Sequence, residues 1–337
     1  MLKTAEYVSI GHPDKVADFI SSYLLDTLIQ QDPTLKYAVE VMIKDNTVIL
    51  GGEVNGYIKI DDISEIVKQA LREIGYDEEY ASVWKEKAID INKLRVIDLI
   101  GIQSSEILQG VSQDGWGDQG VFVGYASQGE DLMPQDLGLA RKLNNALYQK
   151  AKNSKHLGLD IKTQITLDED GKILTAIVAI PMLKQEDLTD FVIDTLGQTP
   201  KQLIINGTGA YTYHSSIADC GITGRKLACD FYSTSCAIGG GSPWTKDPSK
   251  ADLTLNLYAR KLAKEYLKDN DECFVYLSSC IGKSELPSAL VKTIKNGTFK
   301  FEDISVNLKP SEIIDTLNLR RPIFAQLCKN GLVFAEL

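Results

Sequence analysis

A strand–turn–strand–helix pattern recurs along this chain, and the repetition limits its possible folds more than any other feature of the sequence. In two copies, apolar residues alternate along a pair of strands and then recur at helical spacing. The strands and helix of each copy span 37–43, 47–52 and 63–74, and then 161–167, 173–180 and 186–196. A weaker third copy has a strand at 273–280 and a helix at 310–317. The pattern predicts several similar α+β modules, each a sheet with helices on one face.

Length and composition narrow the function as well as the fold. A chain of 337 residues suits two or three compact units. The net charge of −10 argues against a general nucleic-acid binder, because affinity for phosphate backbones needs a basic surface. Without a signal-peptide pattern or an apolar run long enough to cross a membrane, the sequence predicts a cytoplasmic protein with no membrane partner. The six cysteines include no C-x-x-C pair and are predicted to be reduced and mostly buried.

The segment Gly11-His12-Pro13-Asp14-Lys15 opens a predicted helix at 13–31. Proline suits the first helical position, where free backbone N–H groups and the positive end of the helix dipole face outward. A His, an Asp and a Lys at this point could meet a phosphate chain and its metal. Spacing alone also fits a capped helix start with incidental charges.

Glycines or charges stand beside strands at four further places. Glu53 follows two glycines at a strand end, Asp118 lies in a glycine-dense loop, and Lys162 occupies the polar face of a strand. Each of these three also fits an ordinary turn or a solvated edge charge. Glu40 lies inside an apolar strand, so it either faces solvent on the polar side of the sheet or holds a cation.

The densest group of candidate residues runs from 219 to 252. Three consecutive glycines at 239–241 precede a predicted helix at 249–267, and four cations surround them: Arg225, Lys226, Lys246 and Lys250. The spacing of a Walker loop is absent. Glycine-rich backbone, clustered cations and a carboxylate are nevertheless what a polyphosphate with Mg²⁺ requires. The alternative is a solvated loop.

Together and in order, these segments resemble the S-adenosylmethionine synthetases, also called methionine adenosyltransferases. The motifs of that family occur here as Gly-His-Pro-Asp-Lys (11–15), Gly-Gly-Glu (51–53), Gly-Asp-Gln-Gly (117–120), Lys-Thr-Gln-Ile-Thr (162–166), Gly-Ile-Thr-Gly-Arg-Lys (221–226), Gly-Gly-Gly (239–241) and Lys-Asp-Pro-Ser-Lys-Ala-Asp (246–252). Each motif is weak alone, but seven in register are specific.

The resemblance implies a role for each matching residue. The catalytic positions would be His12, Lys162, Arg225 and Lys246, with His12 assisting the departure of triphosphate. The ATP-binding positions would be Asp14, Lys15, Asp160, Lys162, Asp219, Arg225, Lys226, Lys246 and Lys250. The methionine-binding positions would be Glu53, Gln103, Asp118, Tyr211, Asp219 and Lys250. Asp14 and Asp252 would hold two Mg²⁺ ions per site, and Glu40 would hold K⁺.

The resemblance also implies an architecture. The family has three similar α+β domains, βαβ-type repeats related by a pseudo-threefold axis, with sheets covered by helices and built from non-contiguous segments. The expected domains are 1–12 with 119–200, then 13–118, then 201–337. Active sites in the family lie between two subunits, which implies an obligate homodimer or a dimer of dimers.

The reaction implied is synthesis of S-adenosylmethionine from ATP and L-methionine, by in-line attack of the methionine sulfur on C5′. The bound triphosphate is then hydrolysed to pyrophosphate and phosphate. Two alternatives are a triphosphate-cleaving hydrolase that no longer uses methionine, and a non-catalytic regulatory subunit of a synthetase.

The chain departs from the family pattern at several positions. Ile10 stands where the family usually has Glu, Ala210 replaces Arg, and Ile238 replaces His. Residues 213–216 replace a glycine-rich turn, and 242–245 replace smaller residues. The sequence also stops before the closing segment of the family. These changes bear on substrate range, rate and the triphosphatase step more than on the fold or ATP binding.

Overall fold

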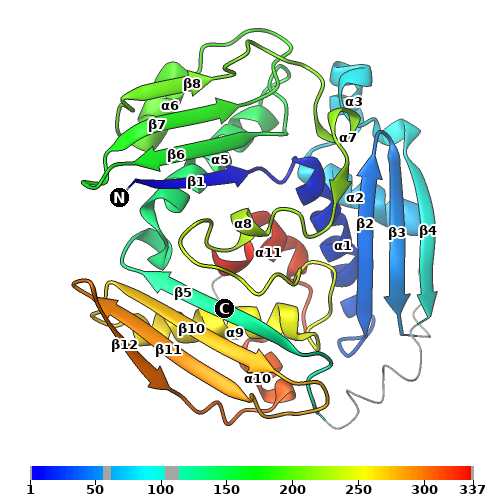
Figure 1. Ribbon diagram of the computed structural model, residues 1–337. Helices are drawn as coiled ribbons and strands as arrows, with labels where there is room; N and C mark the ends of the chain where they lie inside the picture. Colours follow the sequence, from blue (N-terminus) through cyan, green and yellow to red (C-terminus); the bar gives the residue numbers. More distant parts are fainter. Residues whose placement is uncertain (1, 56–61, 103–113, 335–337) are drawn as a thin grey trace.

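The computed structural model describes residues 2–55, 62–102 and 114–334, which form three four-stranded sheets with helices packed against them (Figure 1). The strands are β1 Lys3–Val8, β2 Tyr37–Lys44, β3 Thr47–Val54, β4 Arg95–Ile102, β5 Gly120–Ser127, β6 Lys162–Leu167, β7 Ile173–Ala179, β8 Gln202–Ile205, β9 Gly221–Ile222, β10 Glu272–Ser279, β11 Ser288–Lys295 and β12 Thr298–Asp303. The α-helices are α1 Pro13–Ile29, α2 Ile63–Ile74, α3 Glu78–Trp84, α5 Gln135–Lys152, α6 Thr189–Leu196, α7 Ser215–Ala218, α8 Leu227–Asp230, α9 Ala251–Leu267, α10 Pro310–Thr316 and α11 Phe324–Asn330. The 3-10 turns are Lys85–Lys87, Ile91–Lys93, Glu130–Leu132 and Leu332–Phe334. This architecture confirms the predicted α+β class with three similar repeats.

Each sheet takes one strand from a segment that is distant in the sequence. The strand orders are β1-β6-β7-β8, β4-β3-β2-β9 and β12-β11-β10-β5. Strands β1, β5 and β9 precede the long helices α1, α5 and α9, respectively. Each of them pairs antiparallel with the first strand that follows another of these helices: β1 with β6, β5 with β10 and β9 with β2. The domains are therefore non-contiguous. The domain bounds from the sequence stay a prediction, although the pairing of β5 with β10 puts 120–127 in a different sheet from β6 and β7.

The third repeat differs from the other two in its last strand. Strands β4 and β8 run parallel to β3 and β7, after the crossover helices α2 and α6. Strand β12 instead returns antiparallel to β11 through Asn296 and Gly297, whose φ angles are 49° and 74°. Positive φ at both central residues is typical of a tight hairpin turn. The missing crossover helix explains why the third copy of the sequence pattern is weak.

Helix α1 lies where the first two sheets meet and organises the site. Pro13 occupies its first turn, as the sequence predicted, and His12 caps it. The helix packs against α2, α11, β2 and β9, so nearly all of it is buried, including the charged residues Asp14, Lys15 and Asp18. Because buried charges are costly unless they are paired, the start of this helix needs a polar network around it.

The sheet β4-β3-β2-β9 is covered by α1 and α2 on one face and is open on the other. Apolar side chains remain exposed on the open face: Met42 at 39%, Leu99 at 65% and Ile222 at 36%. Glu40 precedes Met42 by two residues, shares this face and is also exposed. The carboxylate of Glu40 therefore lies on the solvent side of the sheet, and its role as a cation ligand stays a prediction.

The cysteines agree with the prediction of reduced thiols. All six are free, and Cys229, Cys236, Cys273 and Cys328 are buried. In the part of the chain that the structure describes, no helix is both long and apolar enough to cross a membrane.

Candidate active site

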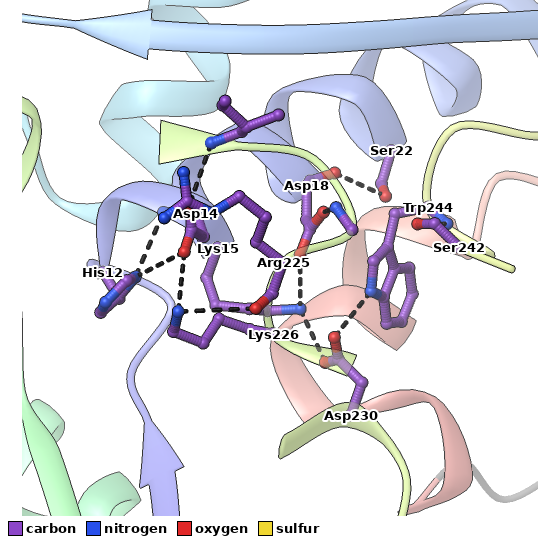
Figure 2. Close-up of polar contacts among 12 residues, drawn as sticks. His12, Asp14, Lys15, Asp18, Ser22, Arg225, Lys226, Asp230, Ser242 and Trp244 are labelled. Atoms are coloured by element: carbon purple, nitrogen blue, oxygen red, sulfur yellow. Dashed lines mark hydrogen bonds and ion pairs between the residues drawn. The ribbon is translucent and has the colours of Figure 1, made fainter. Parts of the chain in front are cut away.

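His12 stands at the N-terminus of α1, facing the sheet β1-β6-β7-β8. Its Nδ1 accepts a hydrogen bond from the backbone N–H of Asp14 at 3.2 Å (Figure 2). Burial, together with the neighbouring cations Lys226 and Lys162, lowers the pKa of His12 to about 3. The ring is therefore neutral near pH 7. Because Nδ1 acts as the acceptor, the single ring proton lies on Nε2, which is available as a donor.

Asp14 gathers cations around the same helix start. Its Oδ1 accepts the backbone N–H of Ile222 at 2.9 Å, and its Oδ2 lies 2.7 Å from Nζ of Lys226. Nε of Arg225 lies 3.4 Å from Oδ1. Only glycine allows this approach at residue 221, since a Cβ there would lie 2.1 Å from the carbonyl oxygen of Pro13. The short strand β9 thereby delivers both cations to the start of α1.

Lys162 and Asp219 act electrostatically on His12, and Asp160 lies near both of them. Asp160 accepts the backbone N–H of Ser215 through Oδ2 at 2.9 Å. Burial, aided by the neighbouring Asp219 and Asp14, raises the pKa of Asp160 to about 6, although the same hydrogen bond and Lys162 act against the rise. This mutual influence puts all four charged groups in one neighbourhood. Tyr211 lies near Asp160, because burial and then the charge of Asp160 raise the pKa of Tyr211.

These residues form one continuous site, called the His12 cluster below. Its members are His12, Asp14, Asp160, Lys162, Asp219, Arg225 and Lys226. All seven were predicted as site positions from the family resemblance, and the structure brings them together although they come from three separate stretches of chain.

A second group, the Lys246 cluster, consists of Lys246, Lys250 and Asp252. The carboxylate of Asp252 pairs with the ammonium of Lys246, and Lys250 caps the following helix α9. The glycine-rich segment folds over this carboxylate, because a Cβ at Gly241 would lie 2.0 Å from Oδ1 of Asp252. Residue 246 also bridges to Ala38 at the edge of β2. Among the described residues, no hydrogen bond or ion pair joins this cluster to the His12 cluster.

The remaining predicted positions lie elsewhere on the chain. Glu53 stands beside Ala38 and Gly101 in the sheet that carries Glu40. Asp118 precedes β5 and accepts the backbone N–H of Gln119 at 2.8 Å. Gln103 lies outside the described residues. Among the described residues, no hydrogen bond or ion pair joins Glu53 or Asp118, which were predicted to bind methionine, to the His12 cluster.

Lys15 was predicted to bind ATP, but its ammonium points away from His12 (Figure 2). The residue is 4% exposed, and Nζ lies 2.7 Å from Oδ1 of Asp230 and 3.2 Å from Oδ2 of Asp18. Burial lowers the pKa of Lys15, but Asp230, Cys328 and Asp18 together outweigh burial, so the pKa of Lys15 is raised. Neither acid was singled out from the sequence. The available signal was the spacing of Asp14 and Asp18, which puts two carboxylates on one face of a buried helix.

Known proteins with the same organisation include the S-adenosylmethionine synthetases. Residues 1–105, 113–213 and 214–336 match the N-terminal, central and C-terminal domain models of that family. The structure is also similar to that of an unusual S-adenosylmethionine synthetase from Campylobacter jejuni, with a TM-score of 0.87. The two share 32% sequence identity, and the match covers 99% of this chain and 95% of the other. The chain therefore belongs to the S-adenosylmethionine synthetase, or methionine adenosyltransferase, family.

Proposed function

We propose that this enzyme joins the sulfur of L-methionine to C5′ of ATP by in-line attack and then hydrolyses the triphosphate to pyrophosphate and phosphate. The observation that carries this mechanism is the His12 cluster, where a neutral imidazole donor meets three cations at one buried helix start. Membership of the synthetase family supports the same reaction.

The chemistry explains why the site is rich in cations. The thioether sulfur is neutral and nucleophilic, so the attack needs no general base. The S–C5′ bond forms as the C5′–O bond breaks, and the electron pair leaves with the triphosphate. The barrier therefore lies in the negative charge that develops on the leaving group and in aligning two substrates.

The His12 cluster can supply what this step requires. Nε2–H of His12 would donate to the bridging oxygen as that oxygen gains charge. Lys162, Arg225 and Lys226 would bind the phosphate oxygens. Asp14 already holds Arg225 and Lys226 at the site without a nucleotide, so these two side chains need little reorganisation when the nucleotide binds.

The donors also fit the magnesium ions that the family implies. Within the described residues no group of three potential ligands occurs, and Mg²⁺ is usually held by one or two carboxylates together with substrate phosphates. Asp14 and Asp252, each now facing a lysine, would hold the two ions. When bound, Mg²⁺ would neutralise charge on the triphosphate. Glu40, whose carboxylate accepts the hydroxyl of Thr223, would offer oxygen ligands to K⁺.

A homodimer, or a dimer of such dimers, would complete the site. The open sheet face exposes Met42, Leu99 and Ile222, and contiguous apolar surface of this kind marks protein interfaces. Glu40 lies on that face and the Lys246 cluster adjoins its edge at β2. A second copy packed there by twofold symmetry would bring the Lys246 cluster of one subunit toward the His12 cluster of the other.

The test is to incubate the purified protein with ATP, methionine, Mg²⁺ and K⁺, and to measure the sulfonium product by mass spectrometry and phosphate release by colorimetry. We expect S-adenosylmethionine only when both substrates and Mg²⁺ are present. Phosphate release without methionine, with no sulfonium product, would instead identify a triphosphate hydrolase. A protein that binds ATP but catalyses neither step would fit the regulatory alternative.

A further inference from the structure

A buried ionic network, the Lys15 cluster, begins one residue after Asp14 and has no part in the proposed chemistry. It consists of Lys15, Asp18, Asp230 and Trp244 (Figure 2). The indole Nε1–H of Trp244 donates to Oδ2 of Asp230 at 2.8 Å, and its ring centroid lies 4.5 Å from Nζ of Lys15. All four residues are at most 4% exposed. The cluster joins α1, α8 and the loop after the three glycines.

Helix α1 also holds the loop that carries the proposed phosphate-binding cations, Arg225 and Lys226. Asp14 and Asp18 are one turn apart, and they accept the backbone N–H groups of Ile222 at 2.9 Å and Gly224 at 2.8 Å. Arg225 follows immediately in the chain. Any rotation of α1 against α8 would therefore shift this loop and its cations.

Trp244 extends this connection to the Lys246 cluster. It lies two residues before Lys246, in the segment 242–245, where the chain departs from the family pattern. The next residue, Thr245, accepts the backbone N–H of Val39 at 3.1 Å, which fixes the loop to β2. The indole is thus the side chain through which the glycine-rich loop reaches the start of α1.

We propose that Trp244 is a positioning residue for nucleotide binding. By donating to Asp230 and covering Lys15, it fixes the loop that leads to Lys246 against the helix start that bears His12 and Asp14. It touches no substrate. The nature of the nucleotide rests on the proposed function, but the positioning role can be tested by binding alone.

Trp244→Phe removes the donor while it keeps an aromatic ring over Lys15. We expect the KM for ATP and the Kd for Mg–ATP, measured by calorimetry without methionine, to rise on the order of tenfold. Misplacements of about 1 Å can cost up to about 100-fold. The KM for methionine should not change. A purely structural role would instead lower the active fraction and leave both ATP constants unaltered.

Trp84→Phe is the matched control, because Trp84 is also buried and its Nε1 has no hydrogen-bond partner in the described part of the chain. It should leave both ATP constants at the wild-type values. Equal ATP constants in Trp244→Phe and Trp84→Phe would overturn the proposal. If Trp244→Phe does not fold, Asp230→Asn gives the same readout, and unchanged ATP binding in that variant would also overturn it. Normal Mg–ATP binding without S-adenosylmethionine formation would contradict the proposed function but not this inference.

Discussion

Replacing Lys162 with methionine is expected to lower kcat for S-adenosylmethionine formation by at least about 100-fold, because one fixed cation is lost from the departing triphosphate. Lys162 begins β6, opposite Val8 in the register, and its charge contributes to the low pKa of His12. The side chain is exposed, so the free energy of unfolding should change by no more than about 0.5 kcal/mol. Single-turnover synthesis and thermal unfolding measure the two effects separately.

Lys172→Met is the control for this substitution. Lys172 is exposed at the opposite end of the β6–β7 hairpin, so its loss should leave synthesis unchanged. Wild-type turnover in Lys162→Met, or an equal loss in both variants, would show that Lys162 has no role at the triphosphate.

Asp14→Asn should be nearly as damaging to activity, with a loss of roughly 100-fold or more in kcat. The amide keeps the acceptor for the backbone N–H of Ile222 but removes the charge that faces Lys226. It also removes the carboxylate proposed to hold Mg²⁺, so the residual activity should require higher Mg²⁺ concentrations. Steady-state rates at saturating ATP across a Mg²⁺ titration measure both effects.

Asp62→Asn provides the comparison, since Asp62 caps α2 by accepting the backbone N–H of Glu65 at 3.0 Å and Asn is an equally good cap. Its activity and Mg²⁺ dependence should match the wild type. If Asp14→Asn keeps its turnover at wild-type Mg²⁺ concentrations, Asp14 is not a magnesium ligand.

Local periodicity predicted much of the secondary structure. The helix at 63–74 was predicted with its observed bounds, and α1 ends two residues before the predicted limit at 31. Helix α9 begins at Ala251 rather than at 249, because Lys250 has extended backbone angles and acts as the cap. Helix α5 was missed, although Leu137, Ala140, Leu143 and Leu147 form a buried stripe at helical spacing.

The pairing of strands that are distant in the sequence could not be predicted from local patterns. Strand β5 lies between segments of two different sheets, and nothing in its own residues shows that it pairs with β10, more than a hundred residues further on. Strand β9 is two residues long, too short for any periodicity. Its position follows from the close approach at Gly221 and from the carboxylate of Asp14, which only the folded chain shows.

The site residues were found because their motifs resemble those of a family, whereas their partners depend on burial. The motif Gly-His-Pro-Asp-Lys led to the same predicted role, ATP binding, for Asp14 and Lys15. A helix turns about 100° per residue, however, so adjacent side chains point in different directions. Asp14 reaches Lys226, and Lys15 reaches Asp230. His214 illustrates the same limit, since its edge-to-face contact with Trp84 could not be predicted from its loop sequence.

In the proposed mechanism, cations from two subunits meet around one nucleotide, and complementation between inactive variants can detect this arrangement. Lys162→Met disables the His12 cluster and Lys246→Met disables the Lys246 cluster, so each homodimer should be inactive. Co-expression of the two chains should produce heterodimers with one intact site each and recover about one quarter of wild-type activity, as random pairing requires. Co-expressed protein that forms mixed dimers but stays inactive would contradict the shared site.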